Sequence, residues 1–299
     1  MIQTRQIGSA ILSIVQEYYG PSHSPTQLLP EAEQSFLEAN RQWLAPSFWI
    51  PGVNRFVVSL HSWVLKVEDK VILIDTGVGN GKSRPAFERL HRLNTQFMGW
   101  LEAAGVTAET VTHVIATHLH PDHIGWNTRL VANEWVPTFP NARYLMPREC
   151  LDYMKRHAAS DPGHGYSLAF EDSVVPLMQR GLVDAFESTD LLPGGLRAEP
   201  AAGHMPGQVS LHFQSQDEHA MFCGDMIHHP IQVLRPEWNS CFDSHPEEAR
   251  ETRHRLLGLA ADRKALLLPA HFGNPNCGYV HRTATGFAFE PALWPALAS

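Results

Sequence analysis

The chain contains little cysteine and no closely spaced cysteine pair. Of its 299 residues only four are cysteines, and none of them forms a CxxC motif: Cys150, Cys223, Cys241 and Cys277. This scatter excludes a disulfide framework and a zinc ribbon, which both need a regular cysteine pattern. The apolar fraction of 43% is instead typical of a globular protein with a large core.

Positive charge is also scarce. The chain has 23 Lys and Arg against 31 Asp and Glu, which gives a formal net charge of −8, and no basic run stands out locally. A nucleic-acid partner is therefore excluded, because binding phosphates needs a concentrated basic surface. We expect a small-molecule substrate that is mostly neutral, or an anion that a local metal charge attracts.

Long hydrophobic runs are missing as well. No apolar run approaches the roughly 20 residues that span a bilayer, so we expect no membrane partner. Residues 1–20 lack the basic segment, continuous apolar segment and small-residue cleavage site of a signal peptide. We therefore expect a cytoplasmic protein. No repeat, low-complexity tract or linker divides the chain, which predicts one domain over residues 1–299.

Histidine and aspartate, in contrast, are concentrated in one stretch. The sequence ATHLHPDHIGWN, residues 116–127, places His118, His120, Asp122 and His123 within six positions. A tight loop can direct the first two side chains to one side and the next two to the other, which suits two adjacent metal ions. Imidazole and carboxylate groups favour zinc and its first-row neighbours. The alternative is a polar loop whose side chains are satisfied by hydrogen bonds.

Four predicted strands end directly in such residues. The apolar runs VTHVIAT, LRAEPAAG, AMFCG and ALLLPA are followed by His118, His204, Asp225 and His271. Loops at strand ends are where rigid scaffolds hold functional side chains. A partly buried histidine or a strand-end cap is the alternative at each position. The four coincidences together favour one shared site.

These motifs resemble the metallo-β-lactamase superfamily. ATHLHPDHIG resembles its H-x-H-x-D-H signature, and ILIDTG, GHMPGQVS, CGDMI and PAHFG follow in that family's order. The resemblance implies that His118, His120 and His204 bind a first metal ion. It further implies that Asp122, His123 and His271 bind a second, and that Asp225 bridges the two. Asp75 would support the metal-binding loop from behind, although Asp-Thr-Gly after a strand can also be a simple turn.

The same resemblance implies an αββα sandwich, the metallo-β-lactamase fold, with an N-terminal arm and a helical insertion over the active site. We expect an N-terminal strand and arm over 1–53, with a short helix at 31–40, and a metal-binding core over 54–275. Within the core, helical spacing predicts helices over 83–106, ending at Gly105, and over 246–263. The predicted insertion covers 137–190, and a C-terminal tail covers 276–299.

The implied function is metal-dependent hydrolysis. Two divalent metal ions, most readily zinc but also manganese, iron or cobalt, would hold a bridging hydroxide that attacks the substrate. Asp122 would pass a proton to the leaving group. The first choice of substrate is a small, mostly neutral lactone or carboxylic ester. A phosphotriester, a glyoxalase II-like thioester and a β-lactam remain alternatives, and so does a metal-bound sensing module without turnover.

Two departures from related enzymes bear on the substrate. Gln208 stands where many relatives have a second histidine, and His228 stands where quorum-quenching lactonases often have tyrosine. The stretch GDMIHH is closer to aryl-ester hydrolases related to methyl parathion hydrolase. We expect an apolar substrate pocket, with ordinary packing as the alternative for each lining residue. Its predicted lining residues are Trp126, His228, Phe272, Phe48 and Trp49. The aromatic residues of the arm also leave a homodimer open.

Overall fold

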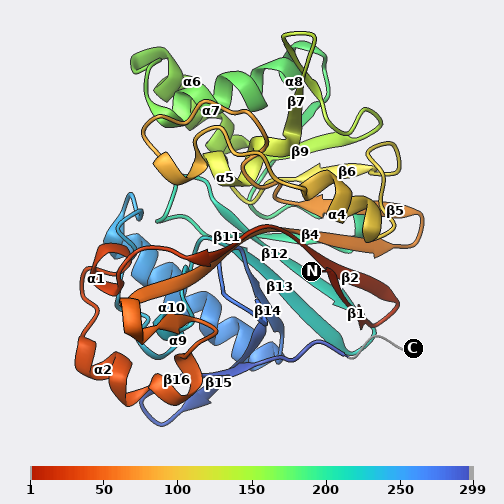
Figure 1. The fold of residues 1–299 in the computed structure, drawn as a ribbon. Helices are drawn as coiled ribbons and strands as arrows, with labels where there is room; N and C mark the ends of the chain where they lie inside the picture. The colour runs from red at the N-terminus through yellow and green to blue at the C-terminus, as the bar shows by residue number, and fades with distance from the viewer. Residues whose placement is uncertain (1, 296–299) are drawn as a thin grey trace.

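Two β-sheets pack face to face in the computed structural model, which describes residues 2–295 (Figure 1). The first sheet has the order β1-β2-β4-β5-β6-β9-β10, with β3 paired to β4. Its strands are β1 (Ile2–Ile7), β2 (Ala10–Pro21), β3 (Trp49–Ile50), β4 (Arg55–Val67), β5 (Lys70–Ile74), β6 (His113–Ile115), β9 (Arg143–Pro147) and β10 (Val183–Phe186).

The second sheet has the order β11-β12-β13-β14-β15-β16. Its strands are β11 (Arg197–Pro200), β12 (Val209–Ser215), β13 (Glu218–Gly224), β14 (Leu266–Pro269), β15 (Gly278–Thr283) and β16 (Gly286–Pro291). A separate hairpin joins β7 (Thr128–Val131) to β8 (Glu134–Pro137).

Both sheets are apolar on both faces, because strand side chains alternate between two hydrophobic clusters. In β5, Ile72 and Ile74 face the cluster between the sheets, whereas Leu73 belongs to an outer cluster. In β14, Leu266 faces the cluster between the sheets and Leu267 lies outside it. Each sheet therefore needs a covering layer on its outer face.

Helices supply these two layers (Figure 1). Over the first sheet lie α4 (Phe97–Ala103), α5 (Pro121–Ile124), α6 (Arg148–Ser160), α7 (Gly165–Ser173) and α8 (Val175–Gln179). Over the second lie α1 (Pro25–Leu28), α2 (Gln34–Ala39), α3 (Arg41–Leu44), α9 (Ile231–Leu234) and α10 (Pro246–Arg263). Short 3-10 turns are η1 (Pro51–Val53), η2 (Glu88–Leu90), η3 (Gly125–Asn127) and η4 (Pro193–Gly195). The predicted αββα sandwich is confirmed.

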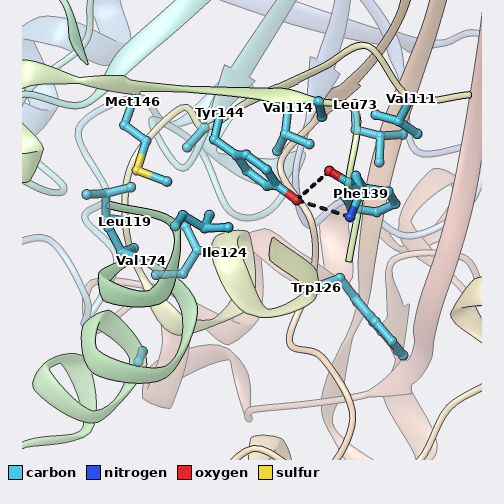
Figure 2. Packing of buried hydrophobic residues seen from close by; sticks show 14 of the residues in the cluster. Leu73, Val111, Val114, Leu119, Ile124, Trp126, Phe139, Tyr144, Met146 and Val174 are labelled. Carbon is cyan, nitrogen blue, oxygen red and sulfur yellow. Dashed lines mark hydrogen bonds between the residues drawn. The ribbon is translucent and has the colours of Figure 1, made fainter. Parts of the chain in front are cut away.

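One buried hydroxyl in the outer cluster of the first sheet forms hydrogen bonds with the backbone. Tyr144 of β9 accepts a hydrogen bond from the Phe139 backbone N–H at 3.1 Å and donates to the Phe139 carbonyl at 3.2 Å (Figure 2). Burial raises the pKa of Tyr144 well above its usual value, so this hydroxyl stays protonated. The contact fixes the turn before β9 against the apolar layer.

Three predicted segments differ from the structure. Residues 137–190 are not wholly an insertion, because β9 and β10 at its two ends pair within the first sheet. The predicted C-terminal tail is, over its described residues 276–295, part of the core, since β15 and β16 form a hairpin that extends the second sheet. The predicted strand of the arm is a hairpin of β1 and β2, which turns at Gly8 with φ +56°.

The helix predicted over 83–106 is shorter than expected. Only α4 and the short turn η2 form there, and the rest of residues 75–96 is irregular. Ala86, Phe87 and Leu90 of this stretch instead line a cavity. The end of the helix is confirmed at Gly105, whose φ of +71° lets the chain reverse. Among residues 2–295, no helix combines the length and apolar character that crossing a membrane requires.

Candidate metal centre

Seven histidine and aspartate side chains meet at one edge of the sandwich. They come from the loop after β6 and from α5, from the loop between β11 and β12, and from the residues directly after β13 and β14. Pro121 begins α5, so that Asp122 and His123 lie in its first turn. Six of the side chains are buried and Asp122 is half-buried. They are His118, His120, Asp122, His123, His204, Asp225 and His271.

Their ligand atoms form two adjacent groups that share the centre. His118, His120 and His204 lie within 4.8 Å of one another, and so do Asp122, His123 and His271. The Nδ1 of His120 lies 2.9 Å from the Nε2 of His204. The structure thus brings together the first and second predicted ligand sets.

Asp225 lies between these groups. Its Oδ1 is 3.0 Å from the Nε2 of His271 and 3.3 Å from the Nε2 of His123. Its Oδ2 is 3.4 Å from the Nε2 of His204 and 3.9 Å from the Nε2 of His118. One carboxylate therefore reaches both halves of the centre, as a bridging ligand must.

Unpartnered polar atoms test whether metal ions fit here. The Nε2 atoms of His118 and His123 and the Oδ1 of Asp225 are buried without a hydrogen-bond partner among the described residues. A buried polar atom left without a partner costs about 1–3 kcal/mol. Imidazole nitrogens and a carboxylate that converge in this way form the donor set of first-row divalent ions. The residues fit two such ions.

At His118, His120 and Asp225 the electrostatics agree with this donor set. Burial and the neighbouring histidines hold the pKa of His118 and of His120 well below its usual value, so both rings are neutral as metal ligands require. Burial opposes ionisation of Asp225, but the charges of His271 and His123 hold the pKa of its carboxyl well below the usual range. Asp225 therefore remains a carboxylate.

Asp75 supports His123 from behind the centre. Its carboxylate accepts hydrogen bonds from the Thr117 backbone N–H and hydroxyl, each at 2.8 Å, and contacts the Nδ1 of His123 at 2.9 Å. It follows β5 directly and has a left-handed φ of 55°. The contact orients the ring so that Nε2 faces the metal site.

Sequence reasoning missed Asp243, which supports His204 in the same way. Its Oδ1 lies 3.2 Å from the Nδ1 of His204, and its Oδ2 accepts from the guanidinium of Arg253 at 3.0 Å. Both Asp243 and Arg253 are buried. No motif marks Asp243, because it is 39 residues from His204 and ends no apolar run.

A cavity of about 470 Å³ opens onto this centre. His120, Asp122, His204, Asp225 and His271 form its metal end. Most of the other walls are apolar, including Leu28, Val58, Leu60, Phe87, Leu90 and Phe242. Tyr166 of α7, also missed by sequence reasoning, stacks on the ring of His120 with centroids 4.5 Å apart.

Of the predicted pocket residues, only His228 lines this cavity. Its ring is 4% exposed, its Nε2 lies 3.3 Å from Asp225 Oδ2, and both ring nitrogens lack a hydrogen-bond partner among the described residues. A buried, unpartnered donor facing a cavity is available to a ligand.

The prediction that four aromatic residues line the pocket is wrong. Trp126 lies in the outer cluster of the first sheet (Figure 2), where it stacks on Phe97, and its indole N–H donates to Glu17 at 2.7 Å. Phe48, Trp49 and Phe272 lie in the cluster over the second sheet. All four are buried in apolar layers and line no part of the cavity described here.

Comparison with known proteins gives the same family. A family model described as the metallo-beta-lactamase superfamily matches residues 56–271. A probable metallo-hydrolase of Mycobacterium tuberculosis is 26% identical over 192 residues, which cover 59% of this chain and 60% of that protein. A hydroxyacylglutathione hydrolase of Aeromonas hydrophila is 25% identical over 226 residues, 76% of this chain and 65% of that protein. The chain thus spans less than two thirds of the length of these relatives.

Solved structures with the same fold match almost the whole chain. The hydrolase AbOPH of the beta-lactamase superfamily has a TM-score of 0.82 at 21% identity, over 99% of this chain and 98% of its own. AidC, a dizinc quorum-quenching lactonase, has a TM-score of 0.80 at 21% identity over the same shares. The matched residues 56–271 contain all seven side chains of the centre, and the chain belongs to the metallo-β-lactamase superfamily.

Proposed function

We propose that the protein hydrolyses a small, partly apolar lactone or carboxylic ester with the help of two divalent metal ions, of which zinc suits the ligands best. The observation that carries this proposal is the apolar cavity of about 470 Å³ that opens onto Asp122, Asp225 and His271. A cavity of this size and character suits a small organic molecule. The structural similarity to AidC, a dizinc quorum-quenching lactonase, also supports a lactone.

The seven side chains of the centre would hold the metal ions. His118, His120 and His204 would bind one, Asp122, His123 and His271 the other, and Asp225 both. Two ions so placed lower the pKa of bound water and polarise the substrate oxygen. The same ligands also accept manganese, iron or cobalt.

Asp122 would handle the proton. It is the one half-buried member of the centre, it lines the cavity, and its Oδ2 lies 3.6 Å from the Nε2 of His271. Its carboxylate therefore faces both the metal ligands and the space for the substrate. From there it would take up the proton of the attacking water and donate it to the leaving oxygen.

His228 and Tyr166 would orient the substrate. The neutral ring of His228 carries one N–H, which can donate to a carbonyl or leaving oxygen near Asp225. Burial raises the pKa of Tyr166 to about 12, so that its hydroxyl stays protonated and can donate as well. Two donor residues in the cavity lining suit an ester, whose oxygens accept hydrogen bonds.

A thioester is the second candidate, because the Aeromonas hydrophila hydroxyacylglutathione hydrolase is similar over 76% of this chain. A hydrolysis panel on purified protein of known metal content separates the candidates. The panel holds acyl-homoserine lactones, simple γ- and δ-lactones, aryl esters, a phosphotriester, a glutathione thioester and a β-lactam. We expect about two metal ions per chain and the highest kcat/KM on a lactone or ester.

One test variant and one control variant accompany this experiment. His204→Ala should lower both metal content and turnover, whereas His281→Ala, which removes an exposed histidine of β15, should change neither. Two metal ions with preferred turnover of the thioester would replace lactones and esters as the substrate class. Full metal content without any turnover would favour a metal-bound sensing module.

A further inference from the structure

The cavity carries one cation that no carboxylate neutralises. Among its described lining residues, Arg89 of η2 is the one with a permanent positive charge. Within residues 2–295 its guanidinium makes a single hydrogen bond, from Nη1 to the hydroxyl of Ser22, and no ion pair. Arg84, five residues earlier, by contrast donates from both Nη atoms to the carboxylate of Asp172. Arg89 therefore keeps most of its donors free.

Ser22 connects Arg89 to a second donor. The buried Ser22 hydroxyl accepts from Arg89 and lies 2.9 Å from the Nδ1 of His23. Its own proton has no other acceptor among the described residues, so it is donated to Nδ1, which leaves the His23 proton on Nε2. Burial and then the charge of Arg89 lower the pKa of His23, so the ring is neutral. His23 thus presents an N–H to the cavity that it lines.

One side of the cavity runs without interruption from this pair of donors to the metal centre. His228 lies beside Asp225, the ring of Phe242 is 6.0 Å from the ring of His228, and His23 meets Phe242 edge-on at 5.6 Å. Since the three rings follow one another, the donors of Arg89 and His23 lie several carbon–carbon bonds away from the metal ligands. One extended molecule can reach both ends of the cavity.

We propose that Arg89, with Ser22 and His23, forms a carboxylate-binding subsite, so that the preferred substrate is an ester or lactone with a carboxylate several atoms from the scissile bond. This inference rests on the proposed hydrolase function and refines it, because it replaces a mostly neutral substrate by a monoanion. A guanidinium with free N–H groups and a neighbouring imidazole N–H match the two oxygens of a carboxylate.

Other negative charges of the protein oppose binding of a carboxylate in the cavity. Glu88 also lines the cavity, makes no ion pair with Arg89, and would repel the same carboxylate. The net charge of −8 gives an anion no general attraction to this protein. Binding of the carboxylate must therefore come from local donors, and removing Glu88 should strengthen it.

Matched substrates test the subsite. Mono-4-nitrophenyl esters of dicarboxylic acids with 6 to 8 carbons are compared with the same molecules capped as methyl esters, on the metal-loaded protein. We expect the acids to be preferred through a lower KM. Arg89→Gln should reduce the acid-to-methyl ester ratio of kcat/KM by about tenfold, the effect of losing a charge-assisted contact. Glu88→Gln should raise the ratio.

Arg92→Gln is the matched control, because it removes an exposed positive charge from the same loop at a residue that does not line the cavity. It should leave the ratio within about twofold of the wild type. If Arg89→Gln lowers kcat/KM equally for the acid and the methyl ester, the proposed subsite is wrong. The same follows if Arg89→Gln and Arg92→Gln change the acid-to-methyl ester ratio equally.

Binding separates failure of the subsite from failure of the proposed function. Calorimetry compares adipate with monomethyl adipate, which share the carboxylate that metal ions can bind and differ in the second one. Tighter binding of adipate, lost in Arg89→Gln and kept in Arg92→Gln, supports the subsite even if no ester is hydrolysed. Equal binding of both ligands by the wild type rejects the subsite even if esters are hydrolysed.

Discussion

At the scale of residues, three histidines of the candidate metal centre are oriented by a second contact on the far side of the ring. The Nδ1 of His123 contacts Asp75 at 2.9 Å, that of His204 contacts Asp243 at 3.2 Å, and that of His271 lies 3.2 Å from the Ser59 carbonyl. Each contact directs Nε2 toward the centre. The geometry of the site is therefore set by oxygens that bind no metal ion themselves.

Asp75→Asn tests this orientation. Asparagine tolerates the left-handed backbone at this position, so the turn should survive. One oxygen cannot serve Thr117 and His123 as two do, and the ring of His123 should lose its fixed direction. We expect metal affinity to fall by about 10–100-fold, measured by competition with a chelator. Asp69→Asn, at an exposed turn, is the control, and equal affinities in both variants would remove Asp75 from this role.

The convergence of the seven histidine and aspartate side chains could be predicted from the sequence, whereas the cavity walls could not. His118, His204, Asp225 and His271 each follow an apolar strand, and neighbouring strands bring their ends to one edge of a sheet. Trp126 lies as close to the metal ligands in sequence, but Glu17 holds its indole in the opposite direction. Adjacency along the chain does not determine the direction in which a loop side chain points.

At the scale of elements, the segment of residues 75–96 depends on two partly buried acids from other parts of the chain. Glu17 of β2 accepts hydrogen bonds from the backbone N–H groups of Val78 at 2.6 Å and Gly79 at 3.1 Å. Asp172 of α7 binds both Arg84 and Lys82. These contacts fix the irregular segment of residues 75–96, part of which the sequence predicts to be helical.

Glu17 should make stability depend on pH. Burial raises its pKa from 4.5 to about 7, against the hydrogen bonds that favour the carboxylate. Between these values the folded state binds more protons than the unfolded state, so the contribution of Glu17 to the free energy of unfolding falls as pH rises. The shift corresponds to roughly 3 kcal/mol.

Glu17→Gln removes this titration. The unfolding free energy of the wild type minus that of the variant should therefore fall by roughly 3 kcal/mol from about pH 5 to about pH 8, as measured by denaturant titration. Glu251→Gln, an exposed position on α10, should give a difference that does not change with pH. A constant difference for Glu17→Gln as well would mean that Glu17 ionises at the same pH in both states.

Asp172→Ala should loosen the cavity wall. It leaves the fully buried Arg84 and Lys82 without their shared carboxylate, which lies 2.7 Å and 3.3 Å from them. Removing one partner of a buried ion pair costs about 3–5 kcal/mol. We expect that loss in denaturant unfolding and faster proteolysis within residues 83–96. Asp262→Ala, which breaks the exposed pair with Arg282, should leave both the unfolding free energy and the cleavage rate nearly unchanged.

At the scale of the whole molecule, the centre joins the two halves of the sandwich. His118, His120, Asp122 and His123 belong to the half of the first sheet, and His204, Asp225 and His271 to the half of the second. The order of motifs predicts this division, since it fixes which strands carry ligands. It does not predict the far wall of the cavity, where Ser22, Arg89 and Phe242 meet from three loops distant in sequence.

Metal removal should therefore destabilise the entire fold. Ions that bind only the folded state stabilise it by about 2.7 kcal/mol per site at a free concentration of 100 Kd. For two sites this corresponds to a fall in Tm on the order of 10 °C on chelation, with recovery when zinc is restored. On chelation, the Tm of His204→Ala should fall less than that of the wild type, and the Tm of His281→Ala should fall by the same amount as that of the wild type. Thermal scans at one fixed rate measure this. An unchanged Tm after complete loss of metal would mean that the apolar layer between the sheets holds the halves together without help from the centre.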